Sequence, residues 1–231
     1  MRLLLVASDP MEYRGILNRM EARRSNHIPV RWSRSGQLNG HEVVLAANGV
    51  GWERAAAAVD AGWSVLRPDA VISTGFCGAL DPKLQIADVV VGARVAAGGR
   101  EYVALPVRSA RAHASGAVCS VDHVVQTAAE KRGLHAIGNI AVEMEAGGVA
   151  ARTEALGAGF FCIRAVTDLA GEDLANDYNR ALRPDGRFDT MRIFRYALSR
   201  PAARLPELVR LLNNCALAAQ TLGEFLADCR F

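Results

Sequence analysis

Several acidic side chains stand where a carboxyl group could carry out acid and base chemistry. Asp168 follows the buried strand expected from Phe160 to Val166, and burial there would raise the pKa of its carboxyl group and help it to carry a proton. Glu143 and Glu145 are two residues apart, which places both on one face of extended backbone. Glu12 lies shortly after the first apolar run. Such residues are suited to general acid and base catalysis.

A segment of small residues, Thr74 to Ala79, is the second feature with a chemical interpretation. It begins where the buried strand expected from Ala70 to Thr74 ends. Its backbone N–H groups could face an anion or a sugar. Its glycines could equally form a tight turn between a strand and a helix. The sequence leaves both interpretations open.

Metal chemistry is not indicated. The five cysteines are scattered and form no CxxC pair, so the sequence predicts neither a disulfide framework nor a zinc site. His113 and His123 are isolated histidines, and a lone histidine is more often structural than catalytic.

The elements that must position these residues alternate between strands and helices. Buried strands are expected at 3–7, 28–33, 42–47, 70–74, 87–97 and 160–166. Helices are expected from Asp9-Pro10 onward and at 52–66, 126–132, 145–156, 189–199 and 205–228, with an irregular loop at 108–118. This alternation predicts an α/β fold with a largely parallel sheet. Ligands bind beyond the carboxyl ends of such strands, where Ser8-Asp9, Thr74–Ala79 and Thr167-Asp168 would lie.

Composition limits the class of protein. The chain has 231 residues, 51% hydrophobic and 22% charged, which fits one globular domain over 1–231. A net charge of +3 is too small to indicate nucleic-acid binding. The apolar run at 3–7 is too short for a signal peptide, and no stretch approaches the ~20 apolar residues of a membrane helix. We therefore expect a cytoplasmic protein.

Three stretches together resemble the nucleoside phosphorylase and methylthioadenosine nucleosidase superfamily. Val71–Pro82 is similar to its glycine-rich loop, Ala141–Ala146 to its ribose-binding signature, and Ile163–Asp168 to its base-binding signature. The resemblance covers roughly residues 1–172 and implies a three-layer α/β/α sandwich with a twisted, mostly parallel sheet. It also implies a homo-oligomer, with a dimer favoured, and cleavage of the N-glycosidic bond of a purine nucleoside.

The resemblance assigns roles to the acidic residues. Asp168 would protonate the leaving base, whereas the alternative is that it caps the next helix. Glu145 would accept hydrogen bonds from the ribose hydroxyls, with Met144 against the sugar and Glu143 beside it. The alternative for Glu145 is a solvated helix start, where the helix dipole favours acids. Glu12 would orient the attacking water, although Asp9-x-x-Glu12 also has the form of a capping box.

The remaining contacts that the resemblance implies come from the loop and the base site. The loop residues Gly75, Phe76, Cys77 and Gly78 would face the sugar or an anion, and Phe76 replaces a serine common in the family. That replacement puts phosphate use in doubt, so no cofactor is expected and inorganic phosphate is an alternative co-substrate. The expected base contacts are Val124, Val125 and Thr167. For the two valines, ordinary core packing is an equally good interpretation.

Within the family, the chain looks most like the hopanoid-associated branch, which implies adenosylhopane as the substrate. From residue 180 to 231 the tail carries nine Arg against five Asp plus Glu. Met191, Phe194 and Leu198 share one face of the helix expected there, which could contact a membrane surface or pack on the core.

Methylthioadenosine, adenosylhomocysteine or futalosine are alternative substrates, and a non-enzymatic nucleoside-binding protein is a further alternative. No GxGxxG follows the first strand, which argues against a dinucleotide-binding dehydrogenase.

Overall fold

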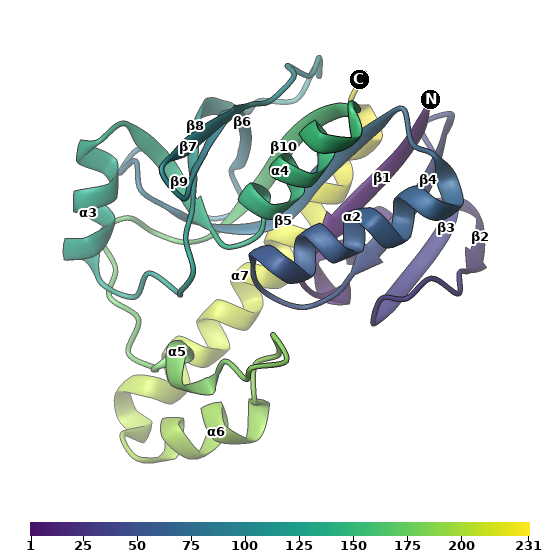
Figure 1. Ribbon diagram of the computed structural model, residues 1–231. Helices are drawn as coiled ribbons and strands as arrows, with labels where there is room; N and C mark the ends of the chain where they lie inside the picture. Colours follow the sequence, from purple (N-terminus) through teal and green to yellow (C-terminus); the bar gives the residue numbers. More distant parts are fainter.

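A ten-stranded sheet organises the chain, for which a computed structural model describes all residues from 1 to 231 (Figure 1). The strands are β1 (Arg2–Ala7), β2 (Glu21–Ser25), β3 (Trp32–Leu38), β4 (His41–Ala47), β5 (Ala70–Ala79), β6 (Val89–Ala97), β7 (Arg100–Val103), β8 (Ala114–Ser120), β9 (Asn139–Glu143) and β10 (Gly159–Asp168). The helices are the 3-10 turn η1 (Pro10–Tyr13), α1 (Arg14–Leu17), α2 (Trp52–Leu66), α3 (Ala128–Ala136), α4 (Ala146–Leu156), α5 (Tyr178–Ala181), α6 (Thr190–Leu198) and α7 (Pro201–Asp228).

Strands β4, β1, β5 and β10 pair in parallel, as do β6, β8 and β9, and the remaining pairs are antiparallel. β1 pairs in parallel with both β4 and β5, and β5 pairs in parallel with β10. β3 and β2 extend one edge as antiparallel strands. At the other side, β10 pairs with β6, which continues through β8 to β9, and β9 returns to the end of β5. The sheet is therefore mixed and curls back on itself beyond β5.

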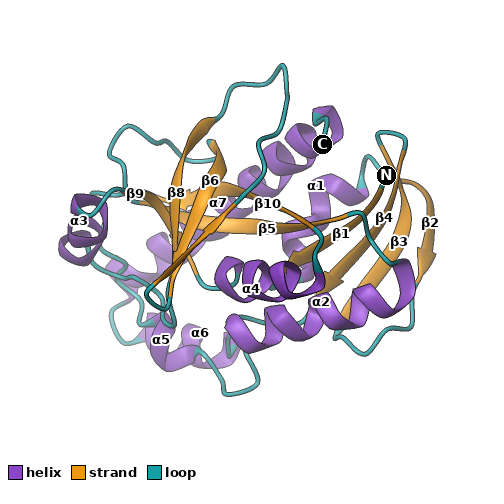
Figure 2. Cartoon of the chain, turned by 45° about the horizontal axis from the view of Figure 1, so that its top comes forward, coloured by secondary structure: helices purple, strands orange, loops and turns teal.

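Helices cover both faces of the sheet, as the three-layer prediction requires (Figures 1 and 2). α2 and α4 lie on one face over a cluster of 28 buried residues, which includes Leu4, Val71 and Val149. α1 and α7 lie on the other face over a second cluster of 22, which includes Leu5 and Phe225. Strands buried between two helical layers need apolar side chains on both sides, which explains their continuous hydrophobic runs. The three-layer α/β/α fold is confirmed.

The short helix α1 is held against α7 by glycines. A Cβ atom on Gly15 would lie 2.1 Å from the backbone oxygen of Ala219, and one on Gly223 would lie 2.1 Å from the carbonyl carbon of Gly15. Only glycine permits this approach of two backbones. The contact fixes η1 and α1 at the carboxyl end of β1, and η1 carries Glu12.

Three local predictions differ from the structure. The segment expected as an irregular loop contains β8, whose residues Ala114 to Ala117 are small and have low strand propensity, so pairing with β6 and β9 decides their conformation. The strand expected at 28–33 instead begins at Trp32 and follows the additional strand β2. The segment Thr74–Ala79 is neither loop nor turn, because β5 continues through it to Ala79.

The Arg-rich tail contains two different structures. α5 and α6 pack against each other and against α7, away from the sheet (Figure 1). The second half of α7 is part of the core, where Ala218, Leu222 and Phe225 are buried. Pro201 starts α7 at its first turn, where the missing N–H costs no hydrogen bond. None of the helices is long and apolar enough to cross a membrane.

Candidate active site

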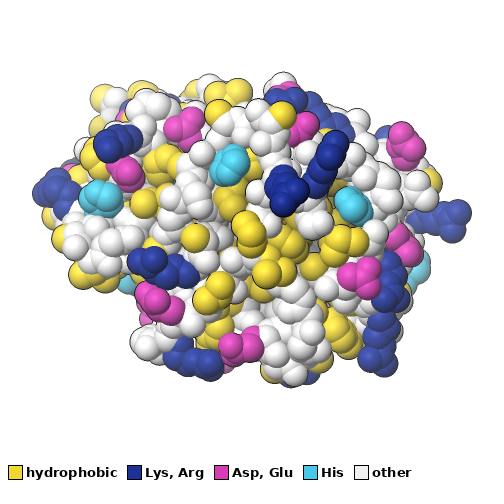
Figure 3. All heavy atoms as spheres, turned by 90° about the horizontal axis from the view of Figure 1, so that it is seen from above, with side chains coloured by type: hydrophobic (Ala, Val, Ile, Leu, Met, Phe, Trp, Pro, Cys, Tyr) yellow, Lys and Arg dark blue, Asp and Glu magenta, His cyan; other side chains and the backbone are white.

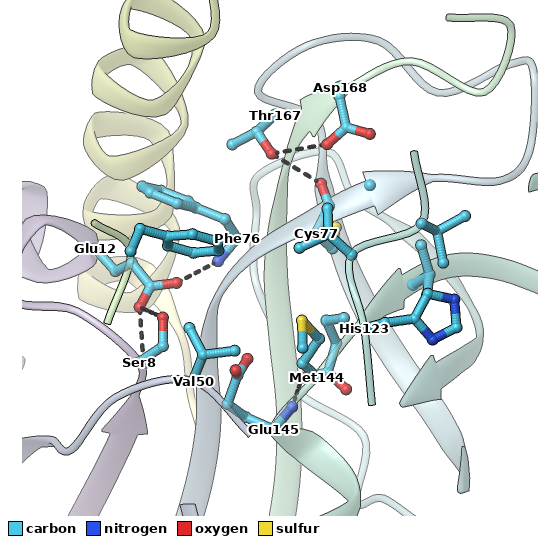
Figure 4. Close-up of a pocket in the computed structure, with 16 residues that line it drawn as sticks. Ser8, Glu12, Val50, Phe76, Cys77, His123, Met144, Glu145, Thr167 and Asp168 are labelled. Atoms are coloured by element: carbon cyan, nitrogen blue, oxygen red, sulfur yellow. Dashed lines mark hydrogen bonds between the residues drawn. The ribbon is translucent and has the colours of Figure 1, made fainter. Parts of the chain in front are cut away.

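A pocket of about 180 Å³ opens where β1, β5, β9 and β10 end (Figure 4). Acidic side chains enter it from three of these strand ends, and apolar side chains fill the space between them. The lining residues are Ser8, Glu12, Val50, Phe76, Cys77, Gly78, His123, Val124, Val125, Val142, Glu143, Met144, Glu145, Thr167, Asp168 and Phe188.

The structure brings eleven of the twelve predicted site residues to this pocket, and Gly75 is the exception. Gly75 has a φ of +133°, which an L side chain rarely adopts. A Cβ atom there would lie 2.2 Å from Glu12 Oε1 and 3.0 Å from an Arg164 nitrogen. Gly75 therefore makes room for the side chains behind the pocket, and its contact with a ligand stays a prediction.

Glu12 combines the two interpretations that the sequence left open. Its Oε2 accepts hydrogen bonds from the Asp9 N–H at 2.8 Å and from the N–H and hydroxyl of Ser8, which completes a capping box with Asp9. Its Oε1 accepts from the Phe76 N–H at 2.8 Å (Figure 4). Burial raises the pKa of Glu12, and these donors oppose the rise. The carboxylate is thus held rigidly at the pocket wall.

Arg164 lies behind the acidic side chains and is fully buried on β10. Its guanidinium group is 2.5 Å from Glu143 Oε2 and 3.7 Å from Glu145 Oε2. It also donates to the Ser73 hydroxyl and the Thr74 carbonyl. Sequence reasoning assigned this residue no role. The available signal was a charged residue inside a strand that is otherwise apolar, because a buried charge needs a partner.

Glu143 and Glu145 share this arginine, but their surroundings differ. Glu143 Oε2 accepts from the N–H groups of Glu145 and Ala146, while its Oε1 has no partner in the chain. Glu145 Oε1 accepts from the Gly51 N–H at 3.1 Å. Burial and the neighbouring Glu143 raise the pKa of Glu145 to about 8. With an exposed fraction of 5%, Glu145 does not lie at a solvated helix start.

Asp168 reaches the pocket from the end of β10. Nine residues separate the end of β10 from the start of the next helix, α5, so the helix-cap alternative is wrong. Asp168 Oδ1 accepts from the Thr167 hydroxyl at 3.1 Å, and Oδ2 accepts from Lys131 Nζ at 2.5 Å. Burial raises the pKa of Asp168, and Lys131 opposes the rise. Gly78 leaves the necessary space, because a Cβ there would lie 2.8 Å from Oδ2.

Apolar residues form the walls between these acids. Val124 is fixed by two hydrogen bonds to Asn179, and Val125 packs with Val142 in a small core cluster while also lining the pocket. Val125 therefore belongs both to the core and to the pocket wall, and its contact with the purine stays a prediction. His123 also lines the pocket, but its ring nitrogens bond Asp122 and Glu130. Sequence reasoning assigned no site role to three other lining residues, Val50, Val142 and Phe188, whereas Ser8 lies at a strand end where a ligand was expected.

The one lining side chain that can carry positive charge is His123, and Asp122 and Glu130 already pair with it. Neither arginine nor lysine is among the lining residues, and Arg14 lies in a different, polar depression with Asn18 and Gln220. No group of three or more His, Cys, Asp or Glu side chains could hold a metal ion.

Comparison with known proteins decides the family. A family model described as "Phosphorylase superfamily" matches residues 3–106 and 101–186. The chain belongs to the phosphorylase superfamily. Among relatives of this superfamily, a 5′-methylthioadenosine/S-adenosylhomocysteine nucleosidase of Geobacillus thermodenitrificans is 31% identical over 205 residues, which cover 75% of this chain and 86% of the relative. The chain is accordingly an enzyme that cleaves N-glycosidic bonds, as nucleosidases and nucleoside phosphorylases do.

Solved structures of the superfamily share the fold. The Streptococcus pneumoniae nucleosidase for 5′-methylthioadenosine and S-adenosylhomocysteine, determined with a transition-state inhibitor, superposes with a TM-score of 0.71 at 20% identity and covers 99% of both chains. A futalosine hydrolase mutant of Helicobacter pylori gives 0.73 at 15% identity, covering 98% of this chain and 96% of the other.

Proposed function

We propose that the chain hydrolyses the N-glycosidic bond of an adenine nucleoside that carries a substituent at the 5′ position. One observation carries this proposal: Asp168, Glu145 and Glu12 line the same pocket from different strand ends. Cleavage of the bond places positive charge on the sugar and negative charge on the leaving base, in an oxocarbenium-like transition state. A proton donor, a sugar ligand and a positioned nucleophile are the groups that this reaction needs.

Each acid has a role in the proposed reaction. Asp168 donates a proton to the purine N7 as the bond between N9 and C1′ breaks. Glu145 and the free Glu143 Oε1 bind the ribose hydroxyls, with Met144 against the sugar. Glu12 orients a water molecule, which adds to C1′ and releases its proton to the Glu12 carboxylate. Val124 and Val125 contact the purine ring. The buried position of these groups strengthens each electrostatic interaction.

Water is favoured over phosphate as the nucleophile. A phosphate dianion needs positive charge, and the lining residues include no arginine or lysine and only one histidine, His123, which is paired with Asp122 and Glu130. The Glu12 carboxylate and the Phe76 side chain also line the pocket, and the first would repel an anion while the second cannot donate a hydrogen bond to it. These features support hydrolysis.

The apolar end of the pocket bears on which substituent the substrate carries at the 5′ position. Val50 and Phe188 extend the pocket with apolar surface, and Phe188 lies two residues before α6. Met191, Phe194 and Leu198 on α6 are each about half exposed, beside Arg192 and Arg195. This arrangement supports an apolar substituent such as that of adenosylhopane, presented at a membrane surface that α6 contacts. On the face opposite α6, basic and acidic side chains are interspersed (Figure 3).

A second candidate rests on the relatives. Their names give 5′-methylthioadenosine and S-adenosylhomocysteine as substrates, so a general nucleosidase of these compounds is the alternative to a long-chain substrate. The homo-oligomer and the cytoplasmic location remain expectations. Exposed apolar residues on α7 support the first of these: Val209, Leu212 and Leu217.

A panel of 5′-substituted adenosines, assayed with and without phosphate, tests the proposal. The panel includes methylthioadenosine, adenosylhomocysteine and an adenosine with a long apolar chain. We expect adenine and a free sugar from the long-chain compound, at a rate that phosphate does not change. Release from methylthioadenosine alone would replace the long-chain substrate with the second candidate. A phosphorylated sugar as the product would refute hydrolysis, and no release from any compound would refute the proposal.

A further inference from the structure

Lys131 is a buried lysine beside the pocket, and neither the motifs nor the reaction proposed above accounts for it. It is one of two lysines in the chain, the other being the exposed Lys83. Its exposed fraction is 0%, and it is the one fully buried residue of α3. A surface helix normally turns an apolar residue toward the protein. α3 instead turns an ammonium group inward.

The lysine ends on the side chain of Asp168. Its Nζ lies 2.5 Å from Asp168 Oδ2 and donates a second hydrogen bond to the Leu169 carbonyl at 2.7 Å. Burial of an unpaired ammonium group costs several kcal/mol. Both partners of Lys131 therefore come from the segment that carries the proposed acid, and the lysine clamps the end of β10.

We propose that Lys131 is a positioning residue for proton donation by Asp168, fixing the carboxyl group through Oδ2 so that its other oxygen serves the leaving base. This inference rests on the function proposed above. Oδ1 accepts one hydrogen bond, from the Thr167 hydroxyl, and a carboxyl oxygen has room for a further partner. The ammonium group also makes the buried acid a better donor, because an acid that holds its proton too tightly transfers it slowly.

The other titratable groups that face Asp168 are acidic or neutral. Glu172, in the turn after β10, acts against ionisation of Asp168 and is itself paired with Arg210 at 3.2 Å. Cys77 on β5 and Cys215 on α7 also lie near Asp168. Burial raises the pKa of both thiols, that of Cys215 to about 12, so they stay neutral. Lys131 is the positive group that acts on the acid.

Two substrates that differ at N7 test this role. A normal purine nucleoside needs a proton at N7, whereas a 7-methylpurine nucleoside already carries a substituent and positive charge there. We expect Lys131→Met to lower turnover of the normal substrate by about tenfold or more, part of the effect of removing a general acid. Turnover of the 7-methyl substrate should stay within about twofold of the wild-type value, because its cleavage needs no proton from Asp168.

The controls separate positioning from folding. Lys131→Arg keeps a cation and should restore part of the lost turnover, and Lys83→Met should behave as wild type. Equal losses on both substrates after Lys131→Met, or no loss on either, would overturn the role of Lys131. Asp168→Asn is measured beside them. If Asp168→Asn kept full turnover of the normal substrate, the proposed acid itself would fail, whatever Lys131→Met shows.

Discussion

At the scale of single residues, the site depends on how three buried carboxyl groups share one arginine. Arg164 attracts Glu143, Glu145 and Glu12, and its single positive charge cannot balance three negative ones. Desolvation therefore favours the protonated form of part of this group. Burial and the neighbouring Glu143 raise the pKa of Glu145 to about 8.

This raised pKa makes the stability of the ligand-free protein depend on pH. Glu145 keeps its proton in the folded protein up to about pH 8, whereas in the unfolded chain it loses the proton near its ordinary value of 4.5. Its contribution is fully present below the unfolded pKa and is lost as the pH rises through 8. We expect the melting temperature of wild type to fall between pH 5 and pH 9, and that of Glu145→Gln to fall less. The difference between the two falls should be at least about 2–4 °C.

Scanning calorimetry across this range makes the measurement. Glu42→Gln, at an exposed position on β4, is the matched control and should keep the wild-type slope. Parallel melting curves for wild type and Glu145→Gln would show that Glu145 titrates normally.

The sequence identified the residues that carry recognisable chemistry but not their buried partners. Asp168 and Glu145 lie in motifs at the ends of predicted strands, so their meeting at one pocket follows from the topology. Lys131 bonds Asp168 from 37 positions away, and Arg164 bonds Glu143 across the sheet. Such contacts depend on how helices and strands pack against one another. Residue types and spacing along a short stretch of sequence do not reveal that packing.

At the scale of elements, β5 differs most from its prediction. Its segment Thr74–Ala79 has the composition of a loop, yet it forms a strand with a positive φ at Gly75. Pairing with β10 and β9 on its two sides overrides the weak strand propensity of its small residues. The helices α2 and α4, each with a glycine beside one end, match their predicted bounds to within one residue.

The amphipathic helix α6 allows a test of membrane contact. We expect the protein to sediment with vesicles that contain anionic lipid, and less so at high salt, because each arginine near the surface contributes about 1 kcal/mol. Arg192→Glu with Arg195→Glu should weaken binding by at least about tenfold. The double change Met191→Ser and Phe194→Ser should also reduce it.

A control variant on another surface distinguishes membrane binding through α6 from nonspecific adsorption of the protein to vesicles. Ile137 is 74% exposed at the end of α3, and Ile137→Ser should leave vesicle binding unchanged. Equal binding by wild type and the α6 variants would rule out α6 as the membrane contact.

At the scale of the whole molecule, three layers hold the parts of the site in one place. The glycine contact between α1 and α7 fixes Glu12, the start of α4 fixes Glu145, and the clamp between α3 and β10 fixes Asp168. The fold class could be predicted from alternating strands and helices alone. The curl of the sheet beyond β5 could not, because it arises from pairings between strands far apart in the chain.

Release of adenine by wild type and by Asp168→Asn is the measurement that tests the central claim most directly. Both proteins are given the best 5′-substituted adenosine, and the free base is quantified over time. We expect wild type to release adenine and Asp168→Asn to be slower by about 10²-fold or more, the usual effect of removing a general acid. Equal rates for the two proteins would contradict the claim that this pocket cleaves the bond with Asp168 as the proton donor.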